Sequence, residues 1–233
     1  MGRPHDNTLL RVPPLESGDR LTRDEFERRY DAMPGLKRAE LIDGVVYVPS
    51  PTRWNEHGVP HVALSTWVGH YWTDTPGVEA GNSSTVRLDL ENEPQPDLAL
   101  IILPSHGGRV EIDEDHYIAG APELVAEISA STASIDLNAK FRLYLRNRVR
   151  EYVVWRVYDG AIDWFIERRG RFGRLKPDAA GVYRSKVFPG LWLDPEAMVL
   201  RDLHRVRQIL QQGIASREHA AFVRRLAQAA APR

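Results

Sequence analysis

The chain has 233 residues, with 31 basic and 32 acidic side chains and a formal net charge of −1. Its content of 42% hydrophobic and 27% charged residues is that of a globular protein with a sizeable core, which excludes a disordered chain. Cysteine is absent, which excludes disulfides, thiolate metal sites and cysteine nucleophiles.

The near-neutral charge also excludes nucleic-acid binding that depends on a general positive excess, so any such contact needs a local patch. The segment KFRLYLRNRVR, residues 140–150, is the candidate patch, although composition alone favours an ordinary solvated helix face. The first residues lack an apolar core of signal-peptide length, and no later stretch is long and apolar enough for a membrane span. We therefore expect a cytoplasmic protein without a membrane partner.

The N-terminal region begins with residues 1–20, whose Pro and Gly without periodicity predict a loose arm. Thr22 and Glu25 then form a capping-box pattern that predicts a helix ending near Pro34. Alternating runs on both sides of Asp43-Gly44 predict a β-hairpin.

The middle of the chain alternates between helix and strand patterns. Apolar positions from Val59 to Val68 predict an amphipathic helix that ends before Pro76, with a weaker strand pair over 78–90. PDLALIIL (96–103) is a near-continuous apolar run of the kind found in central strands. A loop over 104–122 leads to another apolar strand, 123–129.

The second half continues with a helix that Asp136 could cap, followed by strands at 151–157, 161–168 and 181–188. A helix from Pro195 and a second one in the tail follow. The order of elements predicts one α/β domain with a C-terminal helical extension.

Glu127 interrupts the strand 123–129. Alternation places it on the same side as Val125 and Ser129, opposite Leu124 and Ile128. Because burial of an ionised carboxylate without a partner costs several kcal/mol at least, Glu127 needs a cation or a hydrogen-bond donor.

A second acid, Asp97, offers an explanation for the position of Glu127 inside an apolar strand. If strands 97–102 and 124–129 are neighbours, Asp97 and Glu127 converge, and their repulsion raises one pKa or requires a cation between them. A few carboxylates with open positions for water suit Mg²⁺ or Mn²⁺. Lys140, in the first turn of the following helix, could then orient a water or stabilise charge on a phosphate.

Each of these residues also has a simpler interpretation. Asp97 follows Pro96 and by itself is a turn residue. Glu40, at the start of the hairpin, could be exposed, and a helical lysine such as Lys140 is usually solvated.

Two histidines and two further residues stay ambiguous. His57 and His61 have the spacing of two zinc ligands on a helix, but no third ligand is identifiable, and capping or core hydrogen bonding explains them as well. Asp136 is most simply a helix cap, and Tyr144 is expected to pack beside Lys140.

The order of these motifs resembles the Uma-type "putative restriction endonuclease" family of the PD-(D/E)XK nuclease superfamily. The resemblance runs from about Leu21 to Leu193. The residues that carry it are Glu40-Leu-Ile-Asp-Gly, His57, Pro96-Asp97, Glu127-Ile-Ser, Ser131-Thr132, Asp136, Lys140, Tyr144 and Glu151-Tyr152.

The resemblance implies a restriction-endonuclease-like mixed sheet flanked by helices. It also implies that Asp97, Glu127 and the backbone carbonyl of Ile128 hold Mg²⁺ or Mn²⁺, with Glu40 as a direct or water-mediated ligand. Lys140 would replace the superfamily's motif lysine, since Ser129 stands where that lysine is expected. His57, Asp136 and Tyr144 would be accessory residues.

The expected function is that of a metal-dependent endonuclease acting on nucleic acid, with DNA favoured over RNA. The alternative is a catalytically inactive nuclease fold that serves as a binding or assembly module. A metal-free carboxylate pair, as in glycosidases, is a third reading that lacks a sugar-binding motif.

The expected domain boundaries are 1–20 for the arm, 21–193 for the nuclease domain and 194–233 for the helical extension. Apolar stripes in the extension predict helices that cover the chain's own sheet or contribute to a homodimer, because nucleases that cut both strands commonly pair two sites.

Overall fold

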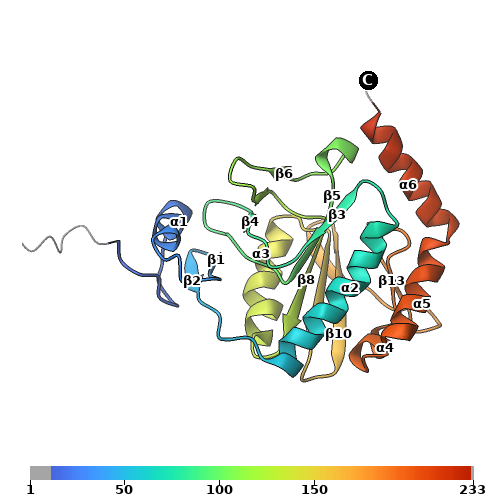
Figure 1. Cartoon of the computed structure of the whole chain (residues 1–233), viewed down its shortest axis with the longest axis horizontal. Helices are drawn as coiled ribbons and strands as arrows, with labels where there is room; N and C mark the ends of the chain where they lie inside the picture. Colours follow the sequence, from blue (N-terminus) through green and yellow to red (C-terminus); the bar gives the residue numbers. More distant parts are fainter. Residues whose placement is uncertain (1–11, 232–233) are drawn as a thin grey trace, which may run out of the picture.

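The computed structural model describes residues 12–231. A mixed six-stranded sheet, with strand order β11-β10-β9-β8-β5-β3, forms its centre (Figure 1). The parallel pair is β8–β9, and the other neighbours are antiparallel. The strands are β3 (Val78–Gly81), β5 (Leu98–Ile102), β8 (Leu124–Ser129), β9 (Glu151–Arg156), β10 (Ala161–Arg168) and β11 (Arg171–Arg174).

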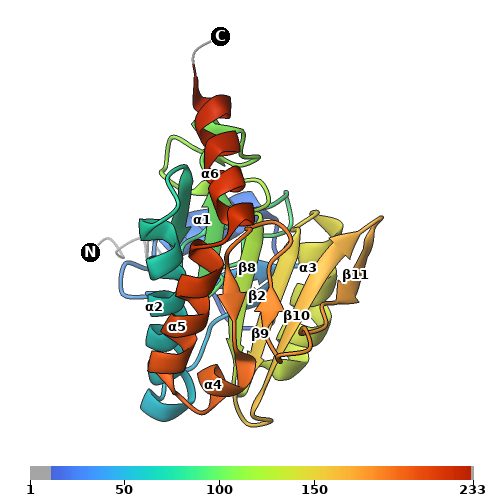
Figure 2. The same cartoon turned by 90° about the vertical axis from the view of Figure 1, so that its right-hand side faces the viewer.

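Helices cover both faces of this sheet (Figures 1 and 2). On one face lie α2 (Val59–Thr73), α4 (Pro195–Val199), α5 (Leu203–Ile214) and α6 (Arg217–Ala230). The other face packs against a π-helical turn, η4 (Ile135–Lys140), and the helix α3 (Phe141–Arg146) that continues it. No helix within residues 12–231 has the length and apolar character needed to cross a membrane.

The alternation predicted for β8 explains how its two faces differ. Leu124, Ala126 and Ile128 belong to the larger core beneath α2 and the C-terminal helices. Val125 belongs to the smaller core beneath α3, so Glu127 points into the layer between the sheet and η4.

The N-terminal elements are α1 (Arg23–Asp31), β1 (Glu40–Ile42) and β2 (Val45–Tyr47). The predicted helix cap and hairpin are both present: the Thr22 side chain accepts from the Glu25 amide, and β1 pairs with β2. Asp43 and Gly44 have φ values of 52° and 70°, the left-handed conformations that a tight hairpin turn requires.

The segment predicted as a loose arm is only partly described, since residues 1–11 lie outside the described range. Leu15 is buried in a small core with Phe26, and the Gly18 amide donates to the Val46 carbonyl. Residues 15–20 therefore pack against the hairpin.

The prediction of a strand pair over 78–90 is wrong. β3 pairs with β5, whereas β4 (Val86–Arg87) joins β7 (Ile118–Ala119) and β6 (Glu111–Ile112) in a separate small sheet. The latter two strands come from the segment 104–122, which was expected to be a loop. Two-residue strands are too short for alternation to reveal.

The C-terminal third also differs in detail from the prediction. Within 181–188 only β12 (Tyr183–Arg184) is a strand, and it pairs with β13 (Trp192–Leu193). The helix predicted from Pro195 is divided at Arg201, whose φ is 61°. The apolar stripes of α5 and α6 pack into the larger core through Val206, Leu210, Phe222 and Leu226.

A buried carboxyl lies beside the hairpin, away from the strand ends described below. Glu93 pairs with Leu41 through two backbone hydrogen bonds, and its Oε2 has no hydrogen-bond partner within residues 12–231. Burial, reinforced by the neighbouring carboxylate of Glu27, raises the pKa of Glu93 to about 9, although Arg87 opposes the shift.

This raised pKa predicts how stability changes with pH. The protonated carboxyl contributes stability that is fully present below about pH 4.5 and is lost as pH rises toward 9. The variant Glu93→Gln is neutral at every pH and serves as the reference. The difference in free energy of unfolding between the wild type and this variant should therefore shift against the wild type by at least about 1 kcal/mol between pH 5 and 8. Urea denaturation at several pH values measures this. The exposed Glu114→Gln is the control, and parallel curves for wild type and Glu93→Gln would contradict the prediction.

Candidate active site

Asp97 and Glu127 lie side by side at the ends of β5 and β8. The antiparallel register pairs Leu98 with Ala126, which brings the preceding Asp97 opposite Glu127. The Ile128 amide donates to Asp97 Oδ2 over 2.8 Å, and the Asp97 amide lies 3.5 Å from Glu127 Oε2. Both carboxylates are buried, at 3% and 2% exposure. The structure thus brings the two predicted ligands to one place.

The Lys140 ammonium joins two of the carboxylates. Its Nζ donates to Glu40 Oε1 and to Glu127 Oε1, each over 2.9 Å. Tyr144, one turn later, donates its hydroxyl to the same Glu127 oxygen over 2.8 Å. The backbone amide of Gln95 donates to Glu40 Oε1 over 2.7 Å. Glu40 is buried, so the interpretation of an exposed hairpin residue is wrong, and Lys140 is not solvated.

Asp136 is not a helix cap. The η4 turn begins after Ser134, which makes no side-chain capping bond, and Asp136 points into the protein. Its Oδ2 accepts from the hydroxyls of Ser129 and Thr132, and its Oδ1 lies 3.9 Å from Lys140 Nζ. The carboxylate joins the cluster because the wide π-helical turn directs it back toward β8.

Arg38 and two histidines contact Asp97 from the outer side. Arg38 Nη1 donates to Asp97 Oδ1 over 3.2 Å, and His57 Nε2 lies 3.0 Å from the same oxygen. His61 Nε2 donates to the Asp97 backbone carbonyl over 2.8 Å. His57 belongs to a π-helical turn, η2 (Trp54–Gly58), that leads into α2. Both histidines therefore contact Asp97, which leaves the zinc interpretation without support.

The two central carboxyls differ in their electrostatic surroundings. Burial raises the pKa of Asp97, but the hydrogen bond from His57 and the charges of His57 and Arg38 outweigh it and hold that pKa well below its usual range. The pKa of Glu127 is raised to about 8. Burial is the main cause, and the neighbouring Asp97 and Asp136 contribute to the rise, whereas the charge of Lys140 opposes it.

The cluster as a whole has an excess of acid. Burial by itself lowers the pKa of Lys140, but the charges of Glu127 and Glu40 raise it above its usual value, so its ammonium stays charged. Four buried acidic groups face two permanent cations: Glu40, Asp97, Glu127 and Asp136 against Lys140 and Arg38.

The side of the cluster that faces solvent is formed by Arg38 and His57. Their side chains are 24% and 23% exposed, whereas that of Lys140 is 5% exposed. A ligand that approaches the carboxylates from solvent therefore meets these two donors at Asp97.

Comparison with known proteins identifies the family. A family model described as "Putative restriction endonuclease", Uma2, matches residues 23–196. The chain belongs to the Uma2 family. The expected resemblance is thereby confirmed.

A solved structure with a related fold is described as a putative nuclease belonging to DUF820 from Anabaena variabilis. It is 14% identical in sequence, with a TM-score of 0.53 over 77% of this chain and 99% of the other. The likeness at this level of identity is one of fold, and it confirms the expected mixed sheet flanked by helices. No curated protein matches the chain at a significant level.

The sequence interpretation missed Arg38 and Gln95 in this Uma2 protein. Arg38 precedes Glu40 by two residues in the alternating run LKRAELI, so the two share a face, and that spacing could have revealed it. No comparable signal marks Gln95, because its contacts with Glu40 and Arg38 use backbone atoms.

The central ion pair predicts a large effect of removing its cation. Lys140→Met keeps the length and apolar stem of the side chain but leaves the buried Glu40 and Glu127 without their shared partner. We expect the free energy of unfolding to fall by about 3–5 kcal/mol at pH 8. Urea denaturation measures this, with the exposed Lys176→Met as the matched control. Equal stabilities of the two variants would show that Lys140 does not hold the cluster together.

Proposed function

We propose that this Uma2 protein is a metal-dependent endonuclease that hydrolyses phosphodiester bonds of nucleic acid, with DNA as the favoured substrate and the cytoplasm as its location. The observation that carries the proposal is the contact of Asp97 with the Glu127–Ile128 segment, inside a buried cluster that has more acidic groups than permanent cations. The family to which the chain belongs supports it.

The donor set fits Mg²⁺ or Mn²⁺ in its chemistry. Asp97 and Glu127 offer hard carboxylate oxygens, with Glu40 as a further direct or water-mediated ligand. The Ile128 amide donates to Asp97 Oδ2, which keeps the backbone of this residue beside the two acids and supports its carbonyl as a further ligand. Within residues 12–231 no three acidic or histidine side chains are placed so that they could hold one metal ion by themselves. The proposal therefore uses two side chains, a carbonyl and waters.

A divalent cation at these ligands would supply Lewis-acid stabilisation of the phosphate and of the leaving oxygen. The residues of the chain have separate tasks. Arg38 and His57, on the solvent side, are placed to donate to phosphate oxygens that approach Asp97. The sequence predicts that Lys140 orients the attacking water, but its Nζ donates to two carboxylates. We therefore assign Lys140 the task of positioning Glu40 and Glu127.

Purified protein should nick or cut DNA only in the presence of Mg²⁺ or Mn²⁺. Asp97→Asn and Glu127→Gln should each lower the rate at least about 100-fold, because each replaces a charged ligand with a neutral amide of nearly the same shape. The exposed Glu218→Gln is the control and should retain the wild-type rate. A gel assay with supercoiled plasmid measures this, and cleavage that persists in excess chelator would contradict the metal-dependent mechanism.

The second candidate function is a nuclease fold that binds or assembles without turnover. It is favoured by the burial of Lys140 between Glu40 and Glu127. Calorimetric titration with Mn²⁺ separates the two candidates: the enzyme should bind the ion through Asp97 and Glu127, and a binding module need not.

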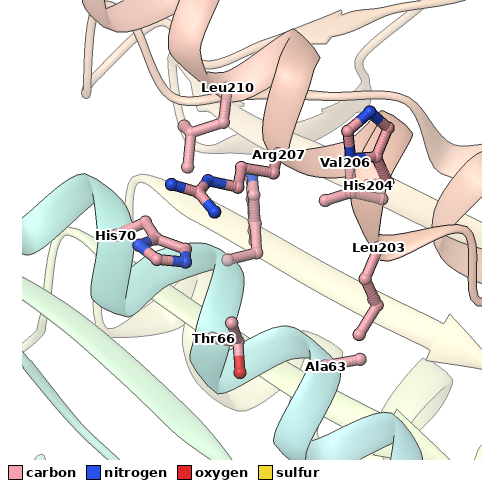
Figure 3. Close-up of a pocket in the computed structure, with 9 residues that line it drawn as sticks. Ala63, Thr66, His70, Leu203, His204, Val206, Arg207 and Leu210 are labelled. Atoms are coloured by element: carbon pink, nitrogen blue, oxygen red, sulfur yellow. The ribbon is translucent and has the colours of Figure 1, made fainter.

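We also propose a homodimer whose contact includes part of the C-terminal helices. A small cavity of about 260 Å³ lies between α2 and α5, with Ala63, His70 and Leu203 among the residues that line it (Figure 3). Apolar side chains around this region are exposed: Val62, Leu200 and Leu203. An isologous contact needs self-complementary apolar surface, which this region offers.

Light scattering on the full chain should give about 53 kDa, twice the 26.5 kDa of one copy. Leu203→Arg should reduce this to the mass of one copy, because it introduces a charge into the proposed apolar contact. Leu90→Arg changes a leucine outside the C-terminal helices that is even more exposed, at 71% against 41% for Leu203, and this variant should stay dimeric. A monomeric wild-type protein would remove the dimer proposal.

A further inference from the structure

A groove with a volume of about 590 Å³ adjoins the carboxylate cluster. It is lined by residues of the edge strand β3, of the strand β5 and of the small sheet, and by Tyr30 and Lys37 from the N-terminal region. A volume of this size is typical of sites for small molecules or for one unit of a polymer.

Gln95 connects the groove to the cluster. Its backbone amide donates to Glu40, and its backbone carbonyl accepts from Arg38. Its side chain points the other way, into the groove wall, where Nε2 donates to the Thr85 hydroxyl over 3.1 Å. One residue therefore contacts both the cluster and the groove.

The groove also lies on the same face of the sheet as Asp97. Ala99 lines it and follows Asp97 by two residues along β5, which places the two side chains about 7 Å apart on one face. That span is covered by one nucleotide unit of an extended strand. A strand whose phosphate meets Arg38 and Asp97 would have its neighbouring nucleotide at the groove.

The lining favours an uncharged polar ring over a phosphate. Hydroxyls come from Ser83, Ser84 and Thr85, and apolar contact comes from Ala99 and Ile112. Lys37 and Glu79 bring opposite charges, so the groove has no cationic excess to hold a phosphate. A flat group with hydrogen-bonding edges and apolar faces matches this lining, and nucleobases have that chemistry.

We propose that the groove binds the nucleobase next to the phosphodiester held at Asp97. A base that enters it must leave its stack and its pairing partner, so the substrate is single-stranded or locally unpaired at this position. The inference rests on the proposed function, because it takes the phosphate to lie at the carboxylate cluster.

Fluorescence anisotropy of labelled single-stranded oligonucleotides tests this in chelator, where no metal-dependent cleavage interferes. The probes are a 12-mer with all its bases and an abasic 12-mer with the same backbone, made in DNA and in RNA. The wild-type protein should bind the base-bearing 12-mer at least about fivefold more tightly, in one or both chemistries. Ile112→Trp, which fills the groove from a half-exposed position, should bind both probes alike.

Lys37 provides a second variant that does not depend on filling the groove. Lys37→Ala should weaken the binding of both probes equally, because a lysine at the rim contacts the oligonucleotide backbone that the two probes share. Lys176→Ala changes an exposed lysine elsewhere and should leave the binding of both probes unchanged. Equal affinity of the wild-type protein for base-bearing and abasic probes, or an unchanged preference in Ile112→Trp, would overturn the proposal. So would a failure of the wild-type protein to bind any probe.

The failure of this inference is distinguishable from the failure of the proposed function. If the protein cuts DNA with Mg²⁺ but shows no base preference, the proposed nuclease function stands and the proposed role of the groove is wrong. If the protein shows the base preference but does not cut, only the proposed nuclease function is wrong.

Discussion

The Lys140 ammonium, held between Glu40 and Glu127, is the interaction on which the rest of this site depends. It joins three segments that are distant in the chain: the N-terminal hairpin, the strand β8 and the η4 turn. Because each of these charges is almost completely buried, removal of any one leaves its partners without compensation in a region of low dielectric. The hairpin and the turn before α3 are therefore tied to the sheet by electrostatics as well as by packing.

This arrangement gives two neighbouring carboxyls opposite properties. Asp97 faces Arg38 and His57 on the solvent side, and its pKa is held low, so it is charged at neutral pH. Glu127 lies among other carboxylates, and burial raises its pKa to about 8. Environments that push the pKa values of paired acids apart are common in active sites. Since the two acids are almost equally buried, the difference arises from their partners: Asp97 contacts His57 and Arg38, whereas Glu127 shares one lysine with other acids.

The features of the fold and of the site that could be predicted from sequence depend on regular periodicity. Strict alternation in LVAEIS placed Glu127 on a defined face, and the apolar run after Asp97 marked a central strand beside it. Asp43-Gly44 identified the hairpin through the φ values that its turn requires. Local rules of this kind operate over a few residues, so a single sequence is enough to apply them.

The parts that could not be predicted depend on irregular backbone or on distant contacts. Asp136 has the sequence signature of a helix cap, but a π-helical turn rotates it into the cluster, and no residue pattern marks such a turn. His61 contacts a backbone carbonyl 36 residues away, which spacing along one helix cannot show. The small sheet is built from two-residue strands, whose pairing is set by tertiary packing and not by their own periodicity.

The central claim is that Asp97 and Glu127 together hold a divalent cation. Anomalous diffraction from crystals soaked in Mn²⁺ tests it most directly, because it locates the ion without any assumption about substrate. We expect a peak within about 2.5 Å of carboxylate oxygens of both residues, with the Ile128 carbonyl beside it, and no such peak in Asp97→Asn. A peak bound to other residues, or full Mn²⁺ occupancy retained at this position in Asp97→Asn, would contradict the claim.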